Sequence, residues 1–221
     1  NDLPDYRPLF EAAFGAPASL DRLGMALGAY QRSATLGGSP FDRWHFGGQQ
    51  DALTDAQIRG YAIFSGRGDC ASCHLIGDQS ALFTDLDFHD TGYGRSREQA
   101  RQTPPATTRI QLAPGVFHDV DFAKVASVGL KREADLGRYE VTEDPADRWK
   151  FRTPSLRNVA LTRPYMHDGA LHTLGDVIRF YNAGGPNHPG QDPRIRPLGL
   201  SETDMADLEA SAADAAARGA P

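Results

Sequence analysis

The chain of 221 residues contains only two cysteines and three methionines, and no stretch of it is continuously apolar over the length of a membrane helix. Because such a helix needs about 20 apolar residues in a row, we expect no membrane span. No block of Lys and Arg occurs and the net charge is −6, so nucleic acid and anionic membranes are not expected partners. The chain begins at Asn1, with no Met and no signal peptide, which indicates a processed, trimmed or partial chain.

What the sequence does contain is the composition of a globular protein. Apolar residues make up 40% and charged residues 24%, which excludes a disordered chain. The length suits one large domain or two small ones. With 23 Gly and 15 Pro, much of the chain is expected to form loops.

Both cysteines lie in one short motif, Gly-Asp-Cys-Ala-Ser-Cys-His, which ends at His74. A redox-active disulfide would need a βαβ context that the sequence does not show, and a zinc site would need two more ligands at zinc-knuckle spacing. The third interpretation is the C-x-x-C-H attachment site of a c-type haem. In that site the thiols of Cys70 and Cys73 form thioethers with the haem, and His74 binds the iron. We therefore predict one covalently bound haem c and, because such haem is attached outside the bacterial cytoplasm, a periplasmic location.

Apolar periodicity and capping residues predict a mostly helical fold. Thr54 with Gln57 forms a capping box, and Thr173 and Ser201 are expected to cap two later helices. The helices are expected over residues 6–15, 19–33, 54–65, 173–182 and 201–217. The Ser-Pro-Phe-Asp stretch at 39–42 is interpreted as a turn, and no strand signal is convincing.

The stretch from 76 to 150 is rich in Gly, Asp, Pro and Thr and shows little periodicity. We interpret it as long loops with short helices near 120–127 and 131–135. So much irregular chain needs something to organise it, and a haem offers a large apolar surface. The predicted fold class is therefore mostly α, a c-type cytochrome fold with long haem-wrapping loops.

Three stretches together resemble the bacterial di-haem cytochrome c peroxidase and MauG family. They are residues 9–15 with 39–42, residues 70–74, and the specific string Phe-Arg-Thr-Pro-Ser-Leu-Arg-Asn-Val-Ala-Leu-Thr-Arg-Pro-Tyr-Met-His-Asp-Gly at 151–169. The resemblance extends from about residue 6 to about residue 200. It implies that residues 1–50 are a helical remnant resembling the end of an N-terminal haem domain, and that residues 51–221 form the C-terminal c-type cytochrome domain.

That family carries two c-type haems, of which the N-terminal one reacts with peroxide and the C-terminal one is six-coordinate and transfers electrons. The single C-x-x-C-H matches the second. The resemblance therefore implies the electron-transferring half of a periplasmic haem oxidoreductase, which meets hydrogen peroxide through a second haem domain. Its further partner would be a redox protein that donates electrons or, in the MauG branch, a protein substrate. No catalytic residue is assigned in this chain.

The sixth iron ligand is expected to decide the chemistry of the haem. By type, the methionines, the remaining histidines and several tyrosines all qualify, with Met166 the common choice in c-type cytochromes. The resemblance instead places the ligand 14 residues after His167, at Tyr181, where the peroxidase branch carries Met and the MauG branch Tyr. A phenolate favours a higher charge on iron than a neutral thioether does. A plain core tyrosine is the alternative for Tyr181, and His167 is expected to orient groups on the distal side of the haem.

Arginine side chains and loop carbonyls supply further candidate contacts. Arg157 and Arg152 are candidates for binding haem propionates, because a guanidinium matches a carboxylate with two parallel hydrogen bonds. The backbone carbonyls of Thr162 and Pro164 match a calcium site of the resembling family, whose side-chain ligand comes from the other haem domain.

An acidic cluster and the choice of function remain open. Asp85, Asp87 and Asp90 lie near His89, and a solvated loop is favoured there over a metal site. An oxidoreductase is the favoured function. A mono-haem electron carrier without catalytic activity is the main alternative, and a haem-based sensor with a displaceable sixth ligand is a third.

Overall fold

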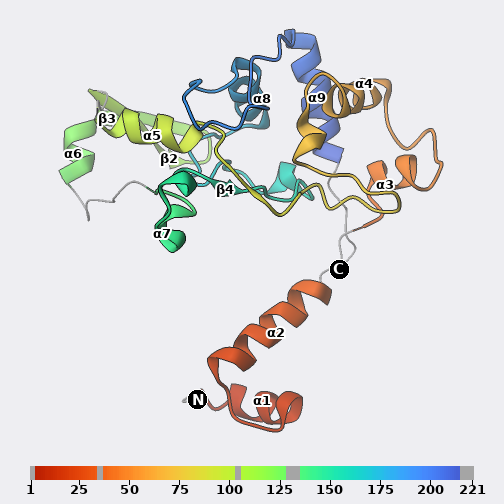
Figure 1. Ribbon diagram of the computed structural model, residues 1–221, viewed down its shortest axis with the longest axis vertical. Helices are drawn as coiled ribbons and strands as arrows, with labels where there is room; N and C mark the ends of the chain where they lie inside the picture. The colour runs from red at the N-terminus through yellow and green to blue at the C-terminus, as the bar shows by residue number, and fades with distance from the viewer. Residues whose placement is uncertain (1–2, 34–36, 103–105, 128–134, 215–221) are drawn as a thin grey trace. The chain divides into compact units, whose positions relative to one another are not determined.

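The computed structural model describes residues 3–33, 37–102, 106–127 and 135–214. The chain separates into two compact units, and the boundary between them in the sequence lies between Gly38 and Ser39. Figure 1 shows the course of the chain through its helices and strands. No helix among the described residues is both long enough and apolar enough to cross a membrane. The predominance of helix agrees with the prediction.

The first unit consists of two helices, α1 (Tyr6–Phe14) and α2 (Leu20–Ser33), close to their predicted positions. Gly15 ends α1 in a left-handed conformation, and its N–H donates to the Glu11 carbonyl at 2.8 Å. Phe10 is buried and stacks on Phe14. The large apolar residues of α2 are all exposed, with Leu20 at 87%.

Four helices form the frame of the second unit: α3 (Pro40–His45), α4 (Asp55–Ser65), α8 (Leu174–Ala183) and α9 (Glu202–Asp214). The predicted capping residues Thr54, Thr173 and Ser201 all accept hydrogen bonds from the first turn of their helices. The last helix is predicted to end at residue 217, and residues 215–217 lie outside the described part of the chain.

The predicted turn at 39–42 is wrong, because these residues begin α3. Ser39 accepts a hydrogen bond from the Asp42 N–H, and the Asp42 carboxylate accepts one from the Ser39 N–H. Pro40 occupies the first helical position, where its missing N–H costs nothing. Since α3 packs into the core through the buried Phe41, residues 39–50 belong to the larger unit and not to the N-terminal segment drawn at 1–50.

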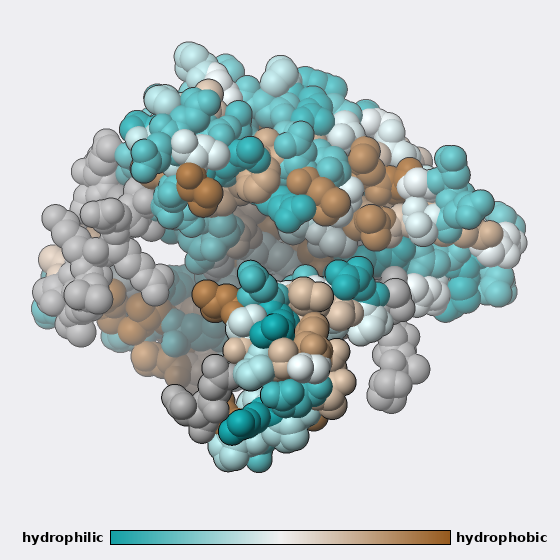
Figure 2. All heavy atoms as spheres, turned by 60° about the horizontal axis from the view of Figure 1, so that its bottom comes forward, coloured by the Kyte–Doolittle hydropathy of each residue, from teal (hydrophilic) through white to brown (hydrophobic). Residues whose placement is uncertain are grey.

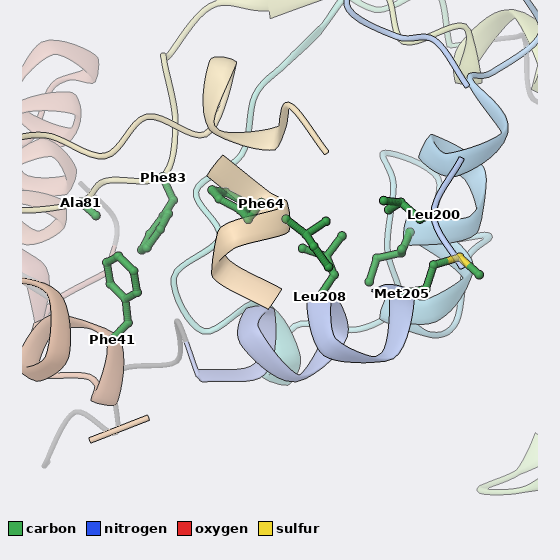
Figure 3. Packing of buried hydrophobic residues seen from close by; sticks show 9 residues of the cluster. Phe41, Phe64, Ala81, Phe83, Leu200, Met205 and Leu208 are labelled. Atoms are coloured by element: carbon green, nitrogen blue, oxygen red, sulfur yellow. The ribbon is translucent and has the colours of Figure 1, made fainter. Parts of the chain in front are cut away.

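The core of the larger unit lies where α4 packs against α9. Figure 3 shows Phe41 and Phe83 at one end of this core, Phe64 in its middle, and Leu200 and Met205 at the other end. The buried face of α4 is formed by Gly60, Ile63 and Phe64, whereas Tyr61 packs partly buried against the core and Ala62 is exposed. Figure 2 shows that other apolar residues are scattered among polar ones on the visible surface.

The segment from 76 to 150 holds more regular structure than predicted. It contains β1 (Phe88–His89), α5 (Tyr93–Gln102), β2 (Thr107–Ala113), β3 (Val116–Asp121), α6 (Phe122–Ser127) and α7 (Tyr139–Thr142). The expected helix at 120–127 is confirmed as α6, and the one at 131–135 lies almost wholly outside the described residues. Single 3₁₀ turns occur at η1 (Cys70–Ser72), η2 (Pro145–Asp147) and η3 (Val159–Leu161).

The expectation that the chain has no strands is wrong in two places. β2 and β3 form an antiparallel hairpin around Pro114 and Gly115, and β1 pairs with β4 (Phe151–Arg152). Most side chains of the hairpin are exposed and none is buried, and only the first five residues of β2 alternate between exposed and half-buried, so the signal that marks a strand in a sequence is weak.

Gly60 is the residue whose substitution should most disturb this core. A Cβ at Gly60 would collide with the Asp207 backbone carbonyl of α9. We expect Gly60→Ala to destabilise the protein by about 1–3 kcal/mol, as overpacking does, measured by urea unfolding. Gly175→Ala is the matched control, because its added methyl meets the movable ends of the Glu209 and Arg179 side chains. Equal stability of the Gly60→Ala and Gly175→Ala variants would contradict the close α4–α9 contact.

Candidate haem-binding site

The C-x-x-C-H motif forms one tight turn directly after α4. The Cys73 and His74 N–H groups both donate to the Cys70 carbonyl, at 3.3 and 2.9 Å, so the three side chains leave the backbone from a single turn. Both cysteines are free thiols and half-buried. Burial raises the pKa of Cys70 to about 12 and raises that of Cys73 as well. Both thiols are therefore less acidic than an exposed cysteine, which disfavours the redox interpretation, because a redox-active cysteine reacts as its thiolate.

His74 is held in the tautomer that a metal ligand requires. Its Nδ1 lies 2.9 Å from the Phe83 carbonyl oxygen, and because a carbonyl only accepts, Nδ1 carries the proton. The unprotonated Nε2 is then the nitrogen available to iron. Burial lowers the pKa of His74, although the Phe83 and Pro154 carbonyls act in the opposite direction, so the imidazole is neutral near pH 7.

Tyr181 is brought to the same site from α8. Burial raises its pKa to about 12, and Cys70 and Cys73 lie near enough to raise it further. The Thr91 side chain hydrogen-bonds the phenol and acts in the opposite direction. Met166, the alternative ligand, is half-buried in the turn that precedes Gly169, with a positive φ of 66°.

This set of side chains fits a haem c. It consists of two thiols for covalent attachment, a neutral imidazole with an oriented Nε2, and a phenol that shares its electrostatic environment with both thiols. A ligand set of nitrogen and oxygen around a covalently held porphyrin iron is chemically complete.

The structure gives Arg157 a protein partner in place of the expected propionate. Its guanidinium donates to both Asp42 carboxylate oxygens at 2.7 Å and to the Ala81 carbonyl at 2.9 and 2.7 Å. Its side chain is only 10% exposed, and it also lies over the Phe83 ring. Arg152, the second candidate, is exposed and donates to the Leu86 carbonyl.

Asp85 and Asp90 belong to a network of enclosed hydrogen bonds and close contacts, so the expectation of a solvated loop is wrong for these two residues, whereas Asp87 is exposed. His89 lies 2.8 Å from an Asp85 oxygen and 2.9 Å from an Asp192 oxygen. Asp90, with a 4% exposed surface, faces His188, while the Asp87 carboxylate accepts from the Phe88 N–H.

Two residues of this network were missed in the sequence. Arg194 donates to both Asp192 oxygens and to the Ser72 carbonyl in the attachment turn, and it holds the pKa of Asp192 at about 2. Because Arg194 lies 122 positions after Ser72 in the attachment turn, no local sequence pattern indicates this contact. Three side chains beside this network also have the donor types and spacing of a metal site. One ligand atom each from Cys73, Asp85 and His89 lies within 4.8 Å of the other two.

The remaining candidates lie on surface turns. Thr162 and Pro164 are exposed and follow η3, where the Thr162 hydroxyl donates to the Val159 carbonyl. His167 is exposed and stacks flat on Phe151, with 3.8 Å between the ring centres. These positions leave the calcium site and the role of His167 as expectations.

Comparison with known proteins supports the resemblance. A family model described as di-haem cytochrome c peroxidase matches residues 1–51. A cytochrome-c peroxidase, IdrP1 of Denitromonas iodatirespirans, is 37% identical over 94% of this chain and 53% of its own length. The methylamine utilization protein MauG of Methylorubrum extorquens is 34% identical over 94% of this chain and 48% of its own length. The chain thus spans about half the length of these curated relatives.

A solved structure shares the fold. The crystal structure of a MauG-like protein associated with microbial copper homeostasis matches 98% of this chain and 59% of its own, with a TM-score of 0.65 and 29% identity. The relatives are named as peroxidases and MauG proteins, which are haem oxidoreductases.

The Arg157–Asp42 pair predicts a pH-dependent loss of stability. Burial alone would raise the pKa of Asp42, but hydrogen bonds from Arg157 and Ser39 outweigh it and lower the pKa below 3.8. The stabilisation is therefore complete above the ordinary pKa and is lost as the pH falls through the lowered one. We expect Asp42→Asn to lower the free energy of unfolding by roughly 3 kcal/mol at pH 7, because it leaves Arg157 unpaired.

The difference in free energy of unfolding between the parent chain and Asp42→Asn should become smaller below pH 3.8, as measured by unfolding curves recorded at acid pH. Asp119→Asn is the control, because the Arg109–Asp119 pair has the same two-pronged geometry on the exposed hairpin. A control variant as unstable as Asp42→Asn would show that burial of the Arg157 pair is unimportant.

Proposed function

We propose that this chain, which is related to the di-haem cytochrome c peroxidase and MauG family over nearly its whole length, is the electron-transferring haem c part of a peroxidase-type oxidoreductase. The observation that carries the proposal is the oriented imidazole of His74 in the same turn as two free thiols, with Tyr181 near enough to interact electrostatically with both thiols. Cys70 and Cys73 would hold the haem, and His74 and Tyr181 would be its axial ligands.

The bound haem supplies one-electron oxidation and reduction at its iron. The chain's own contribution is to fix the ligands and their protonation. The Phe83 carbonyl keeps the proton of His74 on Nδ1, and the Thr91 side chain hydrogen-bonds the oxygen of Tyr181. Burial keeps the phenol of Tyr181 protonated on its own, so the residue would have to lose this proton to serve as an anionic ligand. Such a ligand would favour ferric iron and a low reduction potential.

The proposed partners follow from the same relationship. Hydrogen peroxide would react at a second haem domain, and this chain would exchange electrons between that domain and a redox protein or protein substrate. The site of action is the periplasm, where haem c is attached. The Thr162 and Pro164 carbonyls are proposed to complete a calcium site together with the other haem domain, since calcium prefers oxygen ligands.

A mono-haem electron carrier is the second candidate, and one observation favours it. The sequence holds a single C-x-x-C-H, so the chain carries one haem attachment site. Peroxide-dependent oxidation of a reduced small redox protein separates the two functions. If the chain is part of an enzyme, peroxide-dependent turnover appears only when the second haem domain is added. If the chain is a carrier, it exchanges electrons with the redox protein but shows no turnover with or without that domain.

The identity of the sixth ligand is tested by Tyr181→Phe. We expect the ferric absorption and EPR spectra to change from six-coordinate low spin to high spin, because the oxygen ligand is removed. Met166→Leu is the control and should leave both spectra unchanged. Spectra that are unaltered in Tyr181→Phe and altered in Met166→Leu would show that the sixth ligand is the sulfur of Met166 and not the oxygen of Tyr181.

The stoichiometry of attachment is tested by mass. We expect the chain expressed with a haem c maturation system to gain the mass of one haem that survives acid extraction. Cys70→Ala leaves one thioether, and its pyridine haemochrome band should shift toward longer wavelength, because one vinyl group remains unsaturated. Haem that extracts fully from the parent chain would rule out the covalent site.

A further inference from the structure

Tyr93 is a buried phenol outside the proposed haem ligands, and its hydroxyl is aimed at a carboxylate. It begins α5, is 6% exposed, and donates to Oδ1 of Asp168 at 2.8 Å. Oδ2 of Asp168 accepts from the Arg97 Nε at 2.6 Å, and Oδ1 also accepts from the Ala170 N–H at 3.1 Å. The carboxylate is therefore held in place from three sides.

The charge states of this pair suit proton transfer. Burial opposes ionisation of Asp168, but hydrogen bonds from Arg97 and Tyr93 outweigh it and lower its pKa. Burial, followed by the neighbouring Asp168 charge, raises the pKa of Tyr93. At neutral pH the pair is thus a phenol and a carboxylate. A phenol that loses an electron becomes a strong acid, and a carboxylate at hydrogen-bond distance can take its proton at once.

Aromatic rings connect Tyr93 to the proposed haem ligand. The Phe180 ring lies 5.4 Å from Tyr93 and 5.3 Å from Tyr181, each measured between ring centres and each edge to face. On the other side, Tyr93 meets the exposed His167 ring at 5.5 Å, and His167 stacks on Phe151. The rings form a contact path that runs from the haem ligand through a buried tyrosine to the surface.

We propose that Tyr93 is a redox-active tyrosine that relays single electrons between the site at Tyr181 and the surface at His167. In the forward step the Tyr93 ring gives one electron to a one-electron oxidant, a haem centre of the proposed function that hydrogen peroxide has oxidised beyond the ferric state. The phenolic O–H bond breaks, the proton passes to Oδ1 of Asp168, and a neutral tyrosyl radical and a carboxylic acid result. A reduced redox protein at the surface then returns the electron, and Asp168 returns the proton.

The proposal takes its physiological oxidant from the proposed function, so the experiment has two arms. In the first, the haem-loaded chain, carrying ring-deuterated tyrosine to identify its own tyrosyl signal, is combined with the second haem domain, mixed with hydrogen peroxide, freeze-quenched and examined by EPR. In the second, the chain without haem is oxidised by light with a ruthenium tris-bipyridine complex and persulfate. We expect Tyr93→Phe to remove most of the tyrosyl signal in both arms, far more than one share among seven tyrosines.

Tyr165→Phe is the matched control. Its hydroxyl donates to the Val159 carbonyl at 3.0 Å, and an amide carbonyl is too weak a base to take the proton. This variant should keep the parent signal. Asp168→Asn retains an oxygen that accepts the hydrogen bond but lacks the basic carboxylate, so the radical should form in lower yield and more slowly.

The two arms separate the proposals. A signal that persists in Tyr93→Phe overturns the relay, whether or not haem is attached. A Tyr93-dependent signal in the haem-free arm, together with failure of haem attachment in the first, supports the redox-active tyrosine and rejects the proposed haem function. A Tyr93→Phe variant with the circular dichroism of the parent chain excludes misfolding as the cause of a lost signal.

Discussion

The guanidinium of Arg157 is the contact at which three distant segments of the larger unit meet. It pairs with Asp42 at the start of α3, donates hydrogen bonds to the Ala81 carbonyl and lies over the Phe83 ring. The carbonyl of the same Phe83 accepts a hydrogen bond from the Nδ1–H group of His74. Orientation of the metal-binding nitrogen therefore depends on a buried ion pair, and such a pair is most costly when one partner is removed. The pair explains how an irregular loop can hold a ligand in place.

A second set of ion pairs fixes the other side of the attachment turn. Arg194 reaches the Ser72 carbonyl, and the Asp192 it pairs with also contacts His89, which in turn contacts Asp85. The predicted explanation for the irregular segment was that an apolar cofactor organises it. In this structure, charged side chains from residues far apart in the chain connect its turns to one another. These ion pairs are thus a means of ordering the loops that the chain itself provides.

The signals that the sequence carries locally were interpreted correctly, and those that depend on distant partners were not. Thr54, Thr173 and Ser201 cap their helices as predicted, because a capping residue and its partner are three positions apart. The same local pattern at Ser39 was taken for a turn, although Ser, Pro and Asp at these positions begin a helix. The partners of Arg157 are Asp42 and Ala81, and no spacing rule connects them. The exposed hairpin was missed because its strands bury too little to show a period of two.

Tyr181 and Tyr93 show how the surroundings of a phenol can direct it to different chemistry. Each is placed in an environment that raises its pKa, and one Phe180 ring contacts both. The neighbour of Tyr181 is the Thr91 hydroxyl, a weak base that leaves the phenol oxygen able to exchange its proton for a metal ion. The neighbour of Tyr93 is the Asp168 carboxylate, which binds the phenolic proton strongly once an electron leaves the ring. A ligand role therefore suits the first tyrosine and a redox role suits the second. The identity of the adjacent oxygen accounts for this difference, since both residues are tyrosines in contact with the same Phe180 ring.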